Sequence, residues 1–152
     1  MTANNGLTVS DKPSALQNQL FGILTHLDNT NVKRLPAFQP TIATAKLNGI
    51  LIDKVSKVTG FRGKAGVGGT VTDCIVKLYK VAKDGVVAAK VEVGSLTLAH
   101  ASADGLNVAG TLSATAADLA LAVGDWLYIE VTQAPTGGAD LTVEATYEPQ
   151  VS

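Results

Sequence analysis

Charged residues and cysteines are both scarce in this chain. Asp, Glu, Lys and Arg make up 16% of its 152 residues, while hydrophobic residues make up 46%, against about a quarter charged in an average soluble domain. Such a chain is globular. Its ion-poor surface is either partly buried against other proteins when the protein functions, or it is a soluble surface made polar by Thr and Ser instead of charged residues. The single cysteine, Cys74, excludes an internal disulfide and a zinc site built from cysteines.

Long hydrophobic runs are also missing. No apolar stretch of the sequence approaches the roughly 20 residues of a membrane span. Met1 is not followed by the basic and then apolar stretch of a secretory leader. We therefore expect no membrane partner and synthesis in the cytoplasm, with the product leaving the cell only as part of an assembly.

The charge is nearly balanced overall but unevenly distributed. Residues 1–90 hold all 12 Lys and Arg against 5 acids (12 − 5 = +7), and residues 91–152 hold 8 acids and no base, −8. The sequence has no basic stripe of the kind that would indicate a nucleic-acid partner, so we expect none. Two explanations of the split stay open: neighbouring strands of one fold neutralise each other, or the acidic part of one copy faces the basic part of another.

Reactive groups are too few for an enzyme or a transition-metal site. The only histidines are His26 and His100, and they do not belong to any HExxH or GxSxG motif. The segment Gly63–Thr70 is glycine-rich, but its lysine comes early and a strand pattern follows, so we interpret it as a turn rather than a phosphate loop. No DxDxDG spacing supports calcium, although loop carboxylates leave it open. We expect no enzyme activity and no cofactor.

The N-terminal part has the pattern of one short helix. Ser10 and Asp11 are good helix caps and Pro13 suits a first turn, so the helix is predicted over about 11–28. Five apolar residues form one stripe along it: Leu16, Leu20, Ile23, Leu24 and Leu27. Part of this stripe has the 4-3-4 spacing of a coiled-coil seam. Because the helix is too short to stand alone, its own β-domain, symmetry-related copies or a partner's groove must cover it.

A linker is predicted over Asn29–Gln39, because Asn29, Asn31, Pro36 and Pro40 break regular structure. The predicted division is an arm over 1–40 and a β-domain over 41–152.

The β-domain is predicted from about seven or eight short strands with turns between them. Three of the predicted strands separate an apolar face from a more polar one by alternation. They are Thr70–Val81, where Val76 and its alternate neighbours are apolar, Asp125–Thr132 and Asp140–Tyr147. Asn48-Gly49 is a strong hairpin signal. Further predicted strands are Lys57–Lys64, Val86–Val93 after the turn Lys83-Asp84-Gly85, and Leu96–Ala99. The fold class is all-β, a β-sandwich or jelly roll with a short helical arm.

Three aromatic residues are candidates for a surface that binds a ligand. Trp126, Tyr128 and Tyr147 fall at alternate strand positions and could share a face. Core packing is the other explanation for them, because aromatic residues of sandwiches are commonly buried.

The C-terminal 80–90 residues resemble a β-sandwich domain of tailed-bacteriophage virion proteins. The matching features are Gly63–Gly69 followed by Thr70–Asp73, the Gly124-Asp125 strand that runs to Thr132, and the strand over Gly138–Tyr147. Lys83-Asp84-Gly85 stands where the family commonly has an Asn-Gly turn, and the first 40 residues lie outside the resemblance.

This resemblance implies a virion setting and frequent trimers. It predicts a capsid decoration (cement) protein on the capsid exterior, a homotrimer that fastens neighbouring major capsid proteins. The alternative is a head-fibre or tail-associated module that binds the host surface or a carbohydrate.

Overall fold

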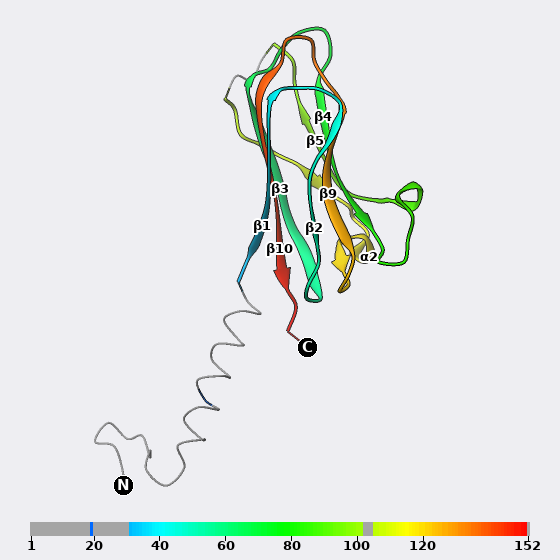
Figure 1. Ribbon diagram of the computed structural model, residues 1–152. Coiled ribbons are helices and arrows are strands. Elements are labelled where there is room, and N and C mark those ends of the chain that lie inside the picture. The colour runs from blue at the N-terminus through cyan, green and yellow to red at the C-terminus, as the bar shows by residue number, and fades with distance from the viewer. Residues whose placement is uncertain (1–18, 20–30, 102–104, 152) are drawn as a thin grey trace, which may run out of the picture.

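The protein is a sandwich of two antiparallel sheets (Figure 1). The computed structural model describes residue 19, residues 31–101 and residues 105–151. In chain order the strands are β1 Lys33–Thr41, β2 Ala45–Leu51, β3 Ser56–Val67, β4 Cys74–Val81, β5 Val91–Leu98, β6 Val108–Ala109, β7 Thr111–Leu112, β8 Ala120–Leu121, β9 Trp126–Gln133 and β10 Ala139–Pro149. A 3-10 helix, η1 (Val87–Ala89), and a short helix, α2 (Ala116–Leu119), lie between them. The predicted all-β sandwich is confirmed.

Consecutive strands mostly alternate between the sheets. The first sheet, named the β10 sheet, has the order β1-β10-β3-β6, with β8 also paired to β3, and the second, the β9 sheet, has the order β2-β9-β4-β5-β7. Among the described strands, only β4 and β5 are consecutive in the chain and paired within one sheet. The sandwich is therefore held together by contacts between segments far apart in the sequence.

The core lies between the two sheets and follows the alternation read from the sequence. Val76 and Leu78 of β4, Ile129 of β9, and Val143 and Ala145 of β10 are fully buried. Each Val, Leu or Ile side chain removed from water in this way contributes about 1.5–3 kcal/mol. Period-2 patterning thus placed the inner face of the strands correctly.

The predicted linker over Asn29–Gln39 is wrong from Lys33 onward, because β1 already begins there. Leu35 pairs with Ala145 of β10 and is only 2% exposed. Two prolines are tolerated because β1 is the outermost strand of its sheet, where a residue without an N–H can face away from the neighbouring strand.

The Asn48-Gly49 hairpin is also wrong, because β2 continues through it and pairs with β9. The register shifts between Lys46 and Gly49, so the pair forms a bulge. The Asn48 side chain accepts the Gly49 N–H (3.0 Å) and donates to the Pro36 carbonyl (2.7 Å). Asn48 thereby links the edge strands of the two sheets.

Three further boundaries differ from the sequence prediction. Strand β3 runs to Val67, so most of the predicted glycine-rich turn is extended. The strand predicted from Thr70 begins at Cys74, and Thr70 makes only an isolated bridge to Thr136. After the predicted turn at 83–85, η1 replaces the start of the Val86–Val93 strand, and β5 absorbs the separate Leu96 strand.

The uneven charge along the chain is neutralised within the fold. Basic residues from the first half pair with acids of the second: Arg34 and Arg62 with Glu144, Lys77 with Glu92, and Lys90 with Glu130. Each pair joins neighbouring strands or loops of one chain. This favours the first explanation of the charge split, neutralisation between adjacent strands.

Val71 has a strained backbone. Its φ of +76° lies in the left-handed region, which a β-branched residue rarely adopts, and its side chain is 75% exposed. We expect Val71→Asn to raise the free energy of unfolding by about 1 kcal/mol, because asparagine tolerates this conformation. In a thermal melt this corresponds to roughly 2–4 °C. Val67→Asn, at an exposed strand position without positive φ, should give no gain; an equal gain in both variants would contradict the strain.

Candidate functional site: an aromatic patch and an arginine–glutamate cluster

The predicted assembly residues of the arm lie outside the described residues. They are Leu16, Leu20, Ile23, Leu24 and Leu27. The helix predicted over 11–28 and His26 lie outside them as well. Their role in assembly stays a prediction.

Two of the three candidate aromatics lie together on the outer face of the β9 sheet. The rings of Trp126 and Tyr128 stack with centroids 4.3 Å apart at 22°, and Tyr79 of β4 lies 5.7 Å from Tyr128. Tyr79 and Tyr128 are 8% and 1% exposed, and Trp126 is partly exposed. We name Tyr79, Trp126 and Tyr128 the aromatic patch; Trp126 is its accessible member.

Tyr147 does not belong to this patch. It lies on the inner face of β10, is 2% exposed and packs in the main core between the sheets. The idea that Trp126, Tyr128 and Tyr147 share a surface is therefore wrong for Tyr147. The reason is that β9 and β10 lie in different sheets, so equal alternation along the two strands does not imply a common face.

Two lysines flank the aromatic patch. The Lys46 ammonium lies 5.7 Å from the Trp126 ring centre and 5.5 Å from that of Tyr128. The Lys90 ammonium lies 4.0 Å from the Tyr79 ring and 2.8 Å from a Glu130 carboxylate oxygen. Cation–π contacts of this kind stabilise by about 0.5–1 kcal/mol at exposed sites.

The Tyr128 hydroxyl is buried beneath this arrangement. Among the described residues, no donor or acceptor lies in hydrogen-bonding geometry with it. Burial raises the pKa of Tyr128, and the Lys90 ammonium opposes that rise. At neutral pH the hydroxyl is thus uncharged, and the patch offers a ligand the partly exposed indole of Trp126 and the Lys46 ammonium beside it.

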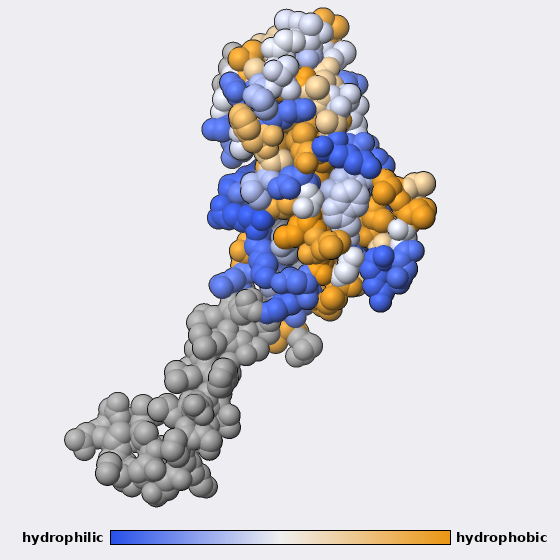
Figure 2. Space-filling view, viewed as in Figure 1, coloured by the Kyte–Doolittle hydropathy of each residue, from blue (hydrophilic) through white to orange (hydrophobic). Residues whose placement is uncertain are grey.

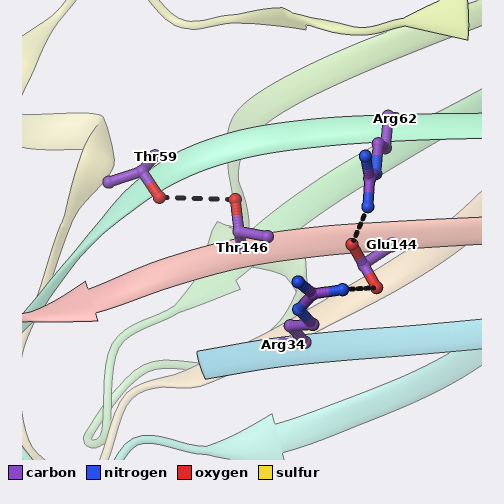
Figure 3. Close-up of polar contacts among 5 residues, drawn as sticks. All are labelled: Arg34, Thr59, Arg62, Glu144 and Thr146. Atoms are coloured by element: carbon purple, nitrogen blue, oxygen red, sulfur yellow. Dashed lines mark hydrogen bonds and ion pairs between the residues drawn. The ribbon is translucent and has the colours of Figure 1, made fainter. Parts of the chain in front are cut away.

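A second cluster lies on the outer face of the β10 sheet (Figure 3). Glu144 of β10 accepts from Arg62 of β3 at 2.8 Å and from Arg34 of β1 at 3.4 Å. Nearby, the Thr59 and Thr146 hydroxyls are 3.3 Å apart. Glu144 is the shared partner that ties the three strands across their outer face.

An open depression of about 340 Å³ lies beside this cluster, lined by Arg34, Gly60, Phe61, Arg62, Ala109, Glu144 and Thr146. The sequence reasoning missed it, because Arg34 and Glu144 are 110 residues apart and only the β1–β10 register brings them together. The charge split was a signal, since it predicted that early bases meet late acids. The cluster can hold polar groups but contains no nucleophile.

The described residues hold no catalytic constellation. His100 Nδ1 lies 2.6 Å from Asp73 Oδ1, and the backbone N–H of His100 also donates to that oxygen. This hydrogen bond lowers the pKa of Asp73. No serine or cysteine of residues 31–101 or 105–151 hydrogen-bonds to His100, so the pair is a link between two loops rather than an activated nucleophile.

Cys74 is buried, and desolvation raises its pKa to about 11, which keeps the thiol protonated and unreactive at neutral pH. In the described part of the chain, no group of three or more His, Cys, Asp or Glu is placed to hold a metal ion. Across the same residues, no helix has the length and apolarity needed to cross a membrane.

Comparison with known proteins finds two solved structures with low similarity to this chain. No protein-family profile matches the chain, and no curated protein matches it. Two solved structures are similar, a chain of infectious bursal disease virus Gx strain (14% identity, TM-score 0.30, 82% of this chain) and one of the Gt strain (12%, 0.28, 80%). This chain spans 38% and 42% of theirs. At such TM-scores the likeness carries no argument about function.

Proposed function

We propose that the protein is a virion structural protein that works by binding rather than catalysis. In the finer form of the proposal it is a capsid decoration protein: a homotrimer on the capsid exterior, made in the host cytoplasm, that fastens neighbouring major capsid proteins. Two lines of support exist. One is the resemblance of strands β9 and β10 and their flanking turns to tailed-phage virion domains. The other is the character of the protein surface, which exposes many apolar side chains and few reactive groups.

The observation that carries the proposal is a surface rich in exposed apolar side chains and poor in reactive groups. Among the described residues, Phe38 is 62% exposed, Leu51 68% and Leu106 59%, and nine valines are also exposed. Scattered single residues of this kind are ordinary, but contiguous ones mark contact sites for proteins. Because Arg34, Arg62, Lys77 and Lys90 are paired with acids, the surface suits protein partners better than nucleic acid.

The proposal is tested on virus particles with and without the protein. Particles lacking it should lose their contents at lower temperature and on milder chelation than complete ones, and adding the purified full chain should restore resistance. A protein that binds only the assembled lattice stabilises it by mass action, by an amount that grows with the logarithm of its free concentration relative to the dissociation constant. Particles that are equally resistant with and without the chain would exclude the cement role.

The aromatic patch favours a second candidate, a module that binds carbohydrate at a host surface. Trp126 is partly exposed and Lys46 lies beside it, an arrangement suited to a sugar ring with polar substituents. The chain has one Trp, so its fluorescence reports this place alone. A saturable fluorescence change with a panel of bacterial surface oligosaccharides, lost in Lys46→Ala, would favour this candidate over cement.

A further inference from the structure

The outer face of the β10 sheet carries two adjoining hollows. The depression beside the arginine–glutamate cluster has a neighbour of the same volume, about 340 Å³, whose lining includes Lys64, Asn107 and Thr142. Arg62 and Glu144 line both hollows. The hollows therefore meet at the ion pair between these two residues, and we name them together the paired hollows.

A glycine keeps the first hollow open. A Cβ at Gly60 would stand 2.6 Å from the hydroxyl oxygen of Thr146, too close for any side chain to be accommodated without a shift. The Thr146 hydroxyl lies 3.3 Å from that of Thr59, and a hydroxyl offers one donor and two acceptor lone pairs. Because position 60 has no side chain, the Thr146 hydroxyl lines the hollow and has hydrogen-bonding capacity left for a ligand.

The two guanidinium groups of the cluster stay accessible although both contact Glu144. The side chains of Arg34 and Arg62 are 62% and 52% exposed, whereas that of Glu144 is 20% exposed. Figure 3 shows the arginines reaching the carboxylate from neighbouring strands. Each guanidinium has five N–H donors, and the contacts with Glu144 use one nitrogen of each. Donors therefore remain for a second carboxylate, which arginine binds in a fork-like geometry.

Positive charge is in surplus at the paired hollows but not along the whole strand. The charged residues of the lining are three bases and one acid (3 − 1 = +2): Arg34, Arg62, Lys64 and Glu144. Towards the two ends of β10, Asp140 and Glu148 follow the same outward alternation and line neither hollow. A long polyanion needs a row of cations and would meet these acids, whereas a ligand with one carboxylate meets only the surplus.

The face around the paired hollows is mostly polar. Figure 2 shows hydrophilic side chains gathered on the side of the domain where β1 and β3 lie, and hydrophobic ones over α2 and the β4–β5 connection. Phe38, which is 62% exposed, pairs with Thr142 across β1 and β10, so the two side chains lie about 5 Å apart on one face. One aromatic ring among hydroxyls and ions lacks the apolar centre of a protein contact, but the C–H face of a sugar ring can pack on it.

We propose that the paired hollows bind a sugar that carries a carboxylate. The remaining N–H donors of Arg34 and Arg62 hold the carboxylate, and the sugar hydroxyls exchange hydrogen bonds with Thr146 and with the free lone pairs of Glu144. A neighbouring ring of the same glycan packs beside Phe38. The site lies on the sheet opposite the aromatic patch. It therefore depends neither on a carbohydrate at Trp126 nor on the capsid role.

The test is a titration of the full chain, followed by the shifts of its backbone amides in ¹⁵N–¹H NMR spectra. The probes are oligosaccharides that end in glucuronate, galacturonate or sialate, each compared with its uncharged methyl ester. At least one acid should shift amides of β3 and β10 saturably. Its ester should bind at least about tenfold more weakly, because the charge-assisted hydrogen bonds are lost.

Arg62→Gln should weaken binding of the acid by about tenfold for the same reason. The matched control is Lys77→Gln, which removes a base from an exposed ion pair on the other sheet, that with Glu92, and should bind as the unmodified chain does. The spectrum of each variant reports folding, and Arg34→Gln serves as the second variant if Arg62→Gln does not fold.

Several results would overturn the proposal. They are no saturable shift with any of the three acids, equal binding of acid and ester, or equal binding by Arg62→Gln and the unmodified chain. A change in Trp126 emission that Arg62→Gln retains would move the sugar to the aromatic patch. Tighter binding of an acidic peptide or an oligonucleotide at the same amides would assign the site to another class of ligand. Particle measurements test the capsid role separately, so either idea can fail alone.

Discussion

Asp125→Ala should lower the free energy of unfolding by about 2 kcal/mol, because Asp125 is a buried acceptor at the meeting point of two loops. One carboxylate oxygen accepts the Ala122 N–H at 2.8 Å, and the other accepts the Lys83 N–H at 3.3 Å. The side chain is nearly buried, with the residue 6% exposed. Removing it leaves two backbone donors without their partner.

Urea unfolding measures this effect as a fall in the midpoint of about 1 M, with an unchanged slope. Asp84→Ala is the matched control, because Asp84 lies in the adjacent loop and its 3.9 Å pair with Lys83 is exposed. Exposed pairs contribute less than about 1 kcal/mol. Equal midpoints for Asp125→Ala and the unmodified chain would contradict the role given to the carboxylate.

Gly49→Val should displace the Trp126 ring and lower the free energy of unfolding by about 1–3 kcal/mol, the usual cost of overpacking. A Cβ at Gly49 would overlap Trp126 Nε1 and stand 2.9 Å from Tyr128 Cβ. The ring must therefore leave its stacked position on Tyr128. This would expose a tyrosine that is now 1% exposed.

Because the chain has one Trp, its emission should shift to longer wavelength as the ring enters water. Ala45→Val is the control, since Ala45 lies in the same edge strand at an exposed position and valine suits a strand. An unshifted emission spectrum in Gly49→Val, together with unchanged stability, would show that Gly49 is not needed for the packing of the aromatic patch.

The inner face of the sandwich could be predicted from the sequence, because burial on one side of a strand leaves a period-2 pattern. Val76 and Leu78 in β4 and Val143 in β10 follow this rule. Asp125, just before β9, accepts the N–H of Ala122 three residues earlier in the turn, as aspartates in turns commonly do. Both features depend on neighbours close in the sequence.

Features set by strand pairing could not be predicted in this way. Asn48-Gly49 has the local chemistry of a hairpin, but pairing of β2 with β9 turns it into a bulge. Pro36 suggested a linker, although an edge strand accepts it. The Arg34–Glu144 contact exists only through the register of β1 with β10. Local preference fails here because the decisive neighbour lies about 80–110 residues away in the chain.

The central claim, that the protein works by assembling on a virus particle, is tested most directly by counting it there. Purified particles from cells that make the protein are analysed by quantitative mass spectrometry against the major capsid protein. The account predicts a fixed ratio that persists through density-gradient purification. Absence from the particles, or a ratio that falls with each purification step, would contradict it.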